Sequence, residues 1–140
     1  MNILKGEIEK LTISGSLTLI GINVNSIGMS AIVIDTPKTA PYLIVGNTIT
    51  VVFKETEVII CKGNTDKISL RNKFEGVIEN LESNELLSKL KIKTTVGTIS
   101  SIITTNAVKQ LELKVGSEVT AMIKTNEIII SEWLIGNHLY

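Results

Sequence analysis

Apolar and polar residues alternate along several short segments of the chain. Near the start, Leu4, Gly6 and Ile8 are separated by charged residues, and Phe74, Gly76 and Ile78 recur later at the same spacing. A period of two residues is typical of strands with one buried face. Similar apolar segments occur at 17–24, 29–34, 48–53, 57–61, 87–94, 99–104, 118–124 and 127–131. The pattern predicts an all-β protein.

The two halves of the chain are copies of one unit. A shift of 70 positions aligns them without a gap, and about 17 of the 70 aligned positions are identical. The identical positions include Gly6 with Gly76, Ile8-Glu9 with Ile78-Glu79, Val45-Gly46 with Val115-Gly116, and Lys54 with Lys124. Other positions, among them Leu4 with Phe74, Ile20 with Leu90 and Phe53 with Ile123, exchange one apolar residue for another. This regularity indicates a tandem duplication.

Each unit has room for five short strands and one short helix. Thr105 is a candidate cap for a helical turn in the second unit, where apolar residues recur at helical spacing. Thr36-Pro37 is the corresponding start in the first unit, and Pro41 limits that helix to one turn. We therefore predict two tandem small five-stranded barrels of the oligonucleotide/oligosaccharide-binding (OB) kind, each with one short helix.

The repeat also predicts the boundaries of the units. The first barrel covers residues 1–62, residues 63–70 form a linker and the start of the next motif, the second barrel covers 68–131, and an apolar tail covers 132–140. A unit of this size buries little surface by itself, so pairing between units or between chains is expected. Trp133 and Leu134 make the tail apolar enough to dock.

Composition excludes several functions. Fourteen basic and fourteen acidic residues cancel, and aromatic residues make up only 4% of the chain, so nucleic-acid binding and attraction to an anionic membrane are not indicated. One cysteine, Cys61, and one histidine, His138, cannot form a zinc site. No catalytic motif or membrane-spanning segment is present, so a cytoplasmic protein that is not an enzyme is predicted.

Two short motifs carry the functional argument. Ser69-Leu70-Arg71-Asn72 is followed by Gly76, and Lys124-Thr125-Asn126 precedes the apolar run at 128–130. With these motifs the chain resembles the Mop family, also grouped as transport-associated OB (TOBE) domains. Two such units in one chain resemble the tandem molbindins. The first copy fits less well, since Met1-Asn2 aligns with Arg71-Asn72, and Glu55 follows Lys54.

The resemblance implies reversible binding of molybdate, or of tungstate, for storage and homeostasis. It also implies a homo-oligomer, a trimer of two-domain chains, with anions held between subunits. The residues that it implies for oxyanion binding are Ser69, Leu70, Arg71, Asn72, Lys124 and Thr125, with Lys54 as a weaker candidate because of the neighbouring Glu55.

The chemistry of these residues is compatible with an oxyanion. A tetrahedral dianion accepts hydrogen bonds on all its oxygens, and it favours backbone N–H groups, hydroxyls and one or two cations. Arg71 can donate to two oxygens, and Lys124 adds a point charge. An alternative function is a ligand-sensing or oligomerisation module that acts with a separate transporter or regulator.

Overall fold

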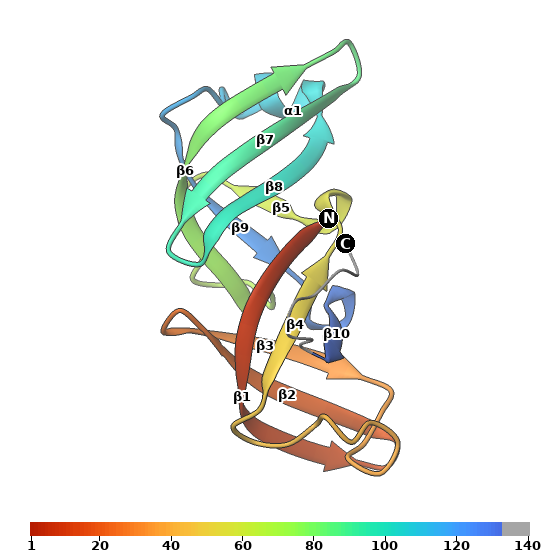
Figure 1. The fold of residues 1–140 in the computed structure, drawn as a ribbon. Helices are drawn as coiled ribbons and strands as arrows, with labels where there is room; N and C mark the ends of the chain where they lie inside the picture. The colour runs from red at the N-terminus through yellow and green to blue at the C-terminus, as the bar shows by residue number, and fades with distance from the viewer. Residues whose placement is uncertain (133–140) are drawn as a thin grey trace.

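The computed structural model describes residues 1–132, which form two curved antiparallel sheets stacked along one axis (Figure 1). The first repeat contributes β1 (Asn2–Ser14), β2 (Leu17–Val24), β3 (Ile27–Val33), β4 (Thr48–Phe53), the 3₁₀ helix η1 (Glu55–Glu57) and β5 (Ile59–Cys61). The second contributes β6 (Asn72–Ser83), β7 (Leu87–Thr94), β8 (Gly97–Thr104), α1 (Thr105–Gln110), β9 (Glu118–Ile123), η2 (Thr125–Glu127) and β10 (Ile129–Glu132). The all-β prediction is confirmed.

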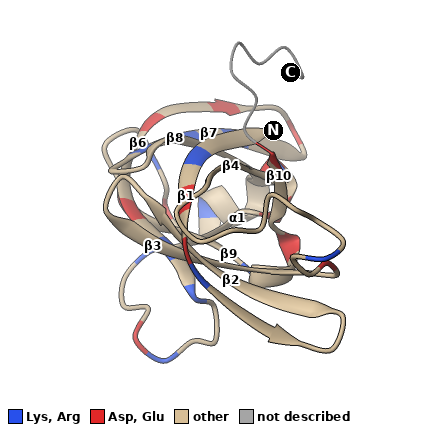
Figure 2. Cartoon of the chain, turned by 60° about the horizontal axis from the view of Figure 1, so that its bottom comes forward, with Lys and Arg blue, Asp and Glu red and all other residues tan. Residues whose placement is uncertain are grey.

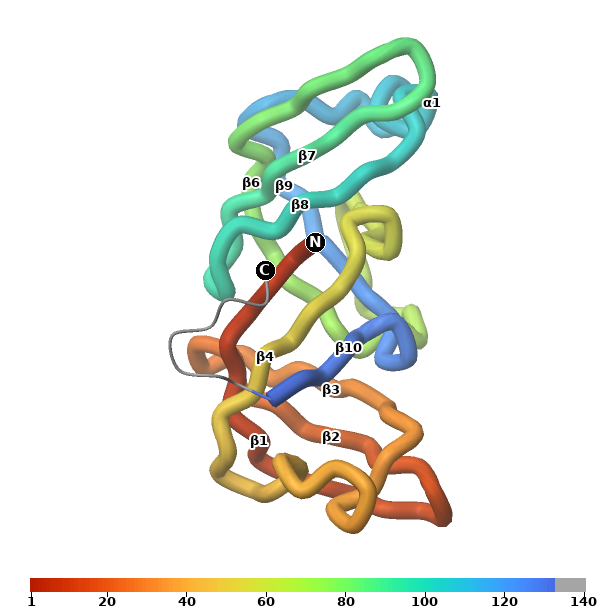
Figure 3. Tube along the Cα trace, turned by 45° about the vertical axis from the view of Figure 1, so that its right-hand side comes forward, coloured from red at the N-terminus to blue at the C-terminus, as the bar shows by residue number. Residues whose placement is uncertain are grey.

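The last strand of each repeat lies in the sheet of the other repeat. The strand orders are β10-β4-β1-β2-β3 and β5-β9-β6-β7-β8. Figure 3 shows β10 beside β4, where Ile129 pairs with Val52 and Glu132 with Ile49. Each five-stranded sheet therefore contains four strands of one repeat and one strand of the other, so the predicted pairing between units is present.

This exchange changes how the predicted boundaries are understood. The ranges 1–62 and 68–131 remain predictions for the two repeats, but neither range by itself supplies all five strands of one sheet. Residues 133–140, which hold most of the predicted apolar tail and His138, lie outside the described residues. Glu132, its first predicted residue, is the last residue of β10.

In the first repeat the predicted one-turn helix is present only as a turn. There, Thr39 and Ala40 donate their N–H groups to the carbonyl of Thr36 at 3.0 and 2.8 Å, which makes a single turn and no helix. Pro41 explains the ending, since it has no N–H group and disfavours helical geometry at the preceding residue.

In the second repeat α1 forms, but its cap is Thr104. The Thr104 hydroxyl accepts from the N–H of Ala107 at 3.1 Å. The predicted cap, Thr105, is instead buried and hydrogen-bonded to Ser88 and to the Asn84 carbonyl. Within residues 1–132, no helix is long and apolar enough to cross a membrane.

The core consists mainly of β-branched residues and leucines from both repeats. Inward-facing side chains of the two sheets belong to one continuous cluster of buried residues, which includes Phe53 and Phe74. Strand exchange places Ile130 of β10 in the first sheet. It also places Val58, the residue directly before β5, next to the second sheet. Both residues belong to the core cluster, which therefore joins the two repeats. The two repeats are therefore expected to unfold together.

Gly76 lies on β6, opposite Thr94 of the paired strand β7, where the two strands approach closely. A Cβ atom there would lie 2.8 Å from Ile92 Cγ2 and 2.9 Å from Thr94 Cγ2, and would also meet the backbone oxygen of Lys93. Gly6 occupies the same place in the first repeat, where a Cβ atom would lie 2.6 Å from Ile22 Cγ2. The motif glycine is thus required by the close approach of a neighbouring strand.

We predict that Gly76→Ala lowers the free energy of unfolding by about 1–3 kcal/mol, because the added methyl group meets backbone that cannot move independently. Chemical denaturation measures the change. Gly28→Ala is the control, since no heavy atom lies within 4 Å of the Cβ position there. Equal effects of the two substitutions would contradict the crowding at Gly76.

Candidate oxyanion site

Two asparagines join the repeats in the same way. Asn72 Nδ2 donates to the carbonyl of Ser30 at 2.9 Å, and Asn72 Oδ1 accepts from the N–H of Ser30 at 2.8 Å. Asn2 makes the equivalent pair of bonds with Ser100, at 2.9 and 2.8 Å. Ser30 lies on β3, the last strand in its sheet order, so the amide of Asn72 takes the place of a neighbouring strand.

The pairing of β6 with β9 brings the two sequence motifs together. Asn72 pairs with Ile123, so the preceding Arg71 and the following Lys124 lie at the same end of this strand pair. Both side chains are exposed. Two cationic residues that are far apart in the sequence are thereby placed at one end of the second sheet.

Arg71 is bonded to its own loop. Its Nε donates to the carbonyl of Ser69 at 3.3 Å, and one terminal nitrogen donates to the carbonyl of Ile68. These bonds are solvent-exposed, so their net contribution to stability is small and a ligand can replace them. Arg71 is therefore available to an anion after a side-chain rotation.

The other motif residues divide into exposed and buried groups. Ser69 is exposed, whereas the Leu70 side chain is only 8% exposed and anchors the loop. Thr125 is half-buried at the start of η2, directly after Lys124. Asn72 is fully buried, and its bonds to Ser30 give it a structural role that the sequence did not identify.

The equivalent end of the first repeat carries an internal ion pair. Asn2 pairs with Phe53, so Met1 and Lys54 lie where Arg71 and Lys124 lie in the second repeat. The Glu55 carboxylate is 3.0 Å from the amino group of Met1 and 3.2 Å from Nζ of Lys89 on β7. The hydrogen bond from the Met1 amino group, assisted by Lys89, lowers the pKa of Glu55 although partial burial opposes the shift.

Lys89 was not among the residues selected from the sequence. It belongs to the other repeat, and the repeat alignment places it opposite Leu19, so no motif marks it. Only the packing of β8, the strand paired with β7, against η1 brings Lys89 to Glu55.

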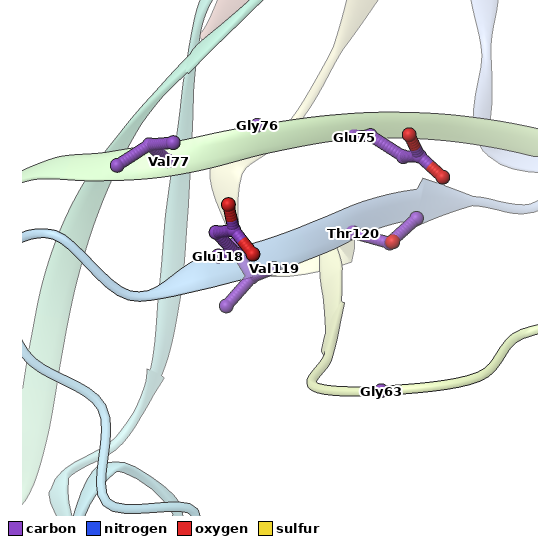
Figure 4. A pocket seen from close by; sticks show the side chains of 7 residues that line it. All are labelled: Gly63, Glu75, Gly76, Val77, Glu118, Val119 and Thr120. Carbon is purple, nitrogen blue, oxygen red and sulfur yellow. The ribbon is translucent and has the colours of Figure 1, made fainter.

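A cleft elsewhere on the second sheet does not fit an anion. It has a volume of about 480 Å³ and is lined by residues of β6 and β9 together with Gly63 (Figure 4). Glu75 and Glu118 line it, and their carboxylates would repel an oxyanion. Figure 2 shows acidic and basic residues interspersed along the chain.

Comparison with known proteins agrees with the resemblance seen in the motifs. Residues 68–130 match the TOBE domain family. Molybdenum-pterin-binding proteins 1 and 2 of Clostridium pasteurianum are 33% and 31% identical to this chain over 64 residues, which are 45% of this chain and 94% of each relative. The chain belongs to the TOBE/Mop family.

A solved structure shows the same tandem fold. It is described as the cytoplasmic molybdate-binding protein ModG with molybdate bound, and it superposes with a TM-score of 0.87. The match covers 94% of this chain and 95% of ModG at 23% identity. The predicted tandem Mop fold is therefore confirmed. The two Clostridium pasteurianum relatives are named for binding, in line with the prediction that the chain is not an enzyme.

We predict that Asn72→Ala lowers the free energy of unfolding by about 2–4 kcal/mol, because two hydrogen bonds are lost and two backbone groups of Ser30 are left unpaired. Denaturation by urea measures the change. Asn80→Ala, at an exposed position of the same strand, is the control. A loss at Asn72 no larger than at Asn80 would contradict a structural role for Asn72.

The Glu55 ion pair predicts an acid-sensitive contribution to stability. Because the folded pKa of Glu55 is lowered, its contribution is present above the pKa of the unfolded chain and is lost as the pH falls through the folded pKa. Glu55→Gln should therefore be less stable than the wild type near neutral pH, with a difference that shrinks towards about pH 3. Urea denaturation over this range measures it, and a pH-independent difference would count against the ion pair.

Proposed function

We propose that this protein binds molybdate or tungstate reversibly, at the end of the second sheet, for cytoplasmic storage and homeostasis of the oxyanion. The observation that carries the proposal is the convergence of Arg71 and Lys124 at the paired ends of β6 and β9. Similarity to ModG, a cytoplasmic protein solved with molybdate bound, and to two molybdenum-pterin-binding proteins supports this choice of ligand.

In the proposed mechanism, Arg71 releases the carbonyls of Ile68 and Ser69 and donates in a fork to two oxygens of the anion. Lys124 supplies the second positive charge, so that a dianion is neutralised. The hydroxyls of Ser69 and Thr125, together with backbone N–H groups of the Leu70 loop, orient the remaining oxygens. Asn72 holds the loop in place through Ser30 and contributes by positioning.

The exposure of Arg71, Lys124 and Ser69 in a single chain supports a site that is completed by another subunit. Water screens exposed charges strongly, whereas a subunit interface lowers the local dielectric and strengthens the same contacts. The first repeat offers an apolar surface for such an interface: Leu17, Leu19, Ile32 and Ile34 are 44%, 42%, 38% and 80% exposed. We propose a trimer of two-domain chains as the assembly.

We predict that Arg71→Ala weakens molybdate binding about 10–100-fold, the effect of losing a charge-assisted hydrogen bond. Isothermal titration with molybdate, tungstate and sulfate measures affinity and stoichiometry, and light scattering on the same samples gives the mass of the binding species. Lys109→Ala, at an exposed position on α1, is the charge-matched control and should bind like the wild type.

Tight binding of molybdate and tungstate with little response to sulfate would support the proposal. An unchanged affinity in Arg71→Ala would place the site elsewhere. The absence of heat with all three anions would reject oxyanion storage and favour a module that acts only with a partner protein.

A further inference from the structure

The two ends of the molecule are built alike but differ in charge. The shift of 70 positions places Met1 on Arg71, Lys54 on Lys124 and Glu55 on Thr125. The strand pairing maintains this correspondence in space, because Asn2 pairs with Phe53 as Asn72 pairs with Ile123. The first repeat thus retains the framework of the oxyanion site, with a carboxylate in place of a hydroxyl.

The Glu55 carboxylate has a positive group for each of its oxygens. Oε1 is 3.0 Å from the amino nitrogen of Met1, and Oε2 is 3.2 Å from Nζ of Lys89. The Glu55 side chain is 19% exposed, whereas those of Met1 and Lys89 are 46% and 45% exposed. The carboxylate is therefore covered by cationic groups that themselves reach solvent.

Lys89 is specific to this end of the molecule. Its counterpart in the first repeat is Leu19, so the end that carries Arg71 and Thr125 receives no such lysine. A glutamate at position 55 and a lysine at position 89 thus occur together, each replacing an uncharged residue of the other repeat. The negative charge of Glu55 is therefore balanced locally by the positive charge of Lys89.

We propose that Glu55 is a built-in occupant of the first repeat's oxyanion position, and that its carboxylate excludes free anions there. The inference rests on the proposed function of the second repeat. A carboxylate and a tetrahedral oxyanion both present oxygen acceptors to the same donors. Removing the carboxylate would leave the Met1 amino group and Lys89 beside a vacated position that suits an anion.

The test is titration of the full chain with sodium molybdate. Glu55→Thr installs the residue found at position 125, and the expected result is one more molybdate bound per chain than in the wild type. Adding Lys89→Ala to this variant should weaken the new site at least about 10-fold, the effect of losing one charged partner. Lys89→Ala alone should leave the wild-type stoichiometry unchanged, because Lys89 is not part of the proposed site in the second repeat.

Glu55→Gln is the second variant, since it retains the shape of the side chain and loses only its charge. Circular dichroism and light scattering establish that each variant is folded and assembled as the wild type. If the wild type binds molybdate and neither folded variant binds an additional molybdate, this inference alone is overturned. No binding by any of the proteins would reject both the inference and the proposed function, whereas a gain in the variants alone would support the inference and reject the second-repeat site.

Discussion

The exchange of closing strands is the constraint on which the rest of this structure depends. A repeat of about 65 residues buries little apolar surface by itself. Here β10 completes the sheet of β1–β4, and β5 completes the sheet of β6–β9. Neither sheet has its fifth strand without the other repeat, so the two copies share one core and hold each other's motif ends in fixed positions.

The asparagine bonds explain why the motif asparagine occurs in both repeats. Arg71 aligns with Met1, whereas Asn72 aligns with an identical residue, Asn2. Both asparagines pair with the backbone of a serine in the opposite repeat. An interaction that joins the repeats is needed at both ends, whereas an arginine for anion binding is needed only where an anion binds. The asparagine thus serves the assembly of the chain, and the arginine serves its proposed site.

Much of the fold could be predicted from the sequence, because period-two patterning and an ungapped repeat define where the strands lie along the chain. The exchange could not be predicted, since Ile129 and Ile130 have the same apolar pattern whether β10 pairs with β4 or with β9. Arg71 and Lys124 lie close together because of the register in which β6 pairs with β9. Neither motif predicts this register by itself. The Glu55–Lys89 pair joins different repeats and follows from packing alone.

Under the roles proposed above, the ion pair allows two copies of one unit to differ in anion binding without loss of the fold. An uncompensated cluster of positive groups near a sheet end would repel itself, and a bound anion or an internal carboxylate can relieve that repulsion. The second repeat leaves the position beside Arg71 and Lys124 without a carboxylate, whereas the first repeat supplies Glu55. Because strand exchange and the asparagine bonds already fix both ends, the choice between an external and an internal anion changes binding without changing the sheets.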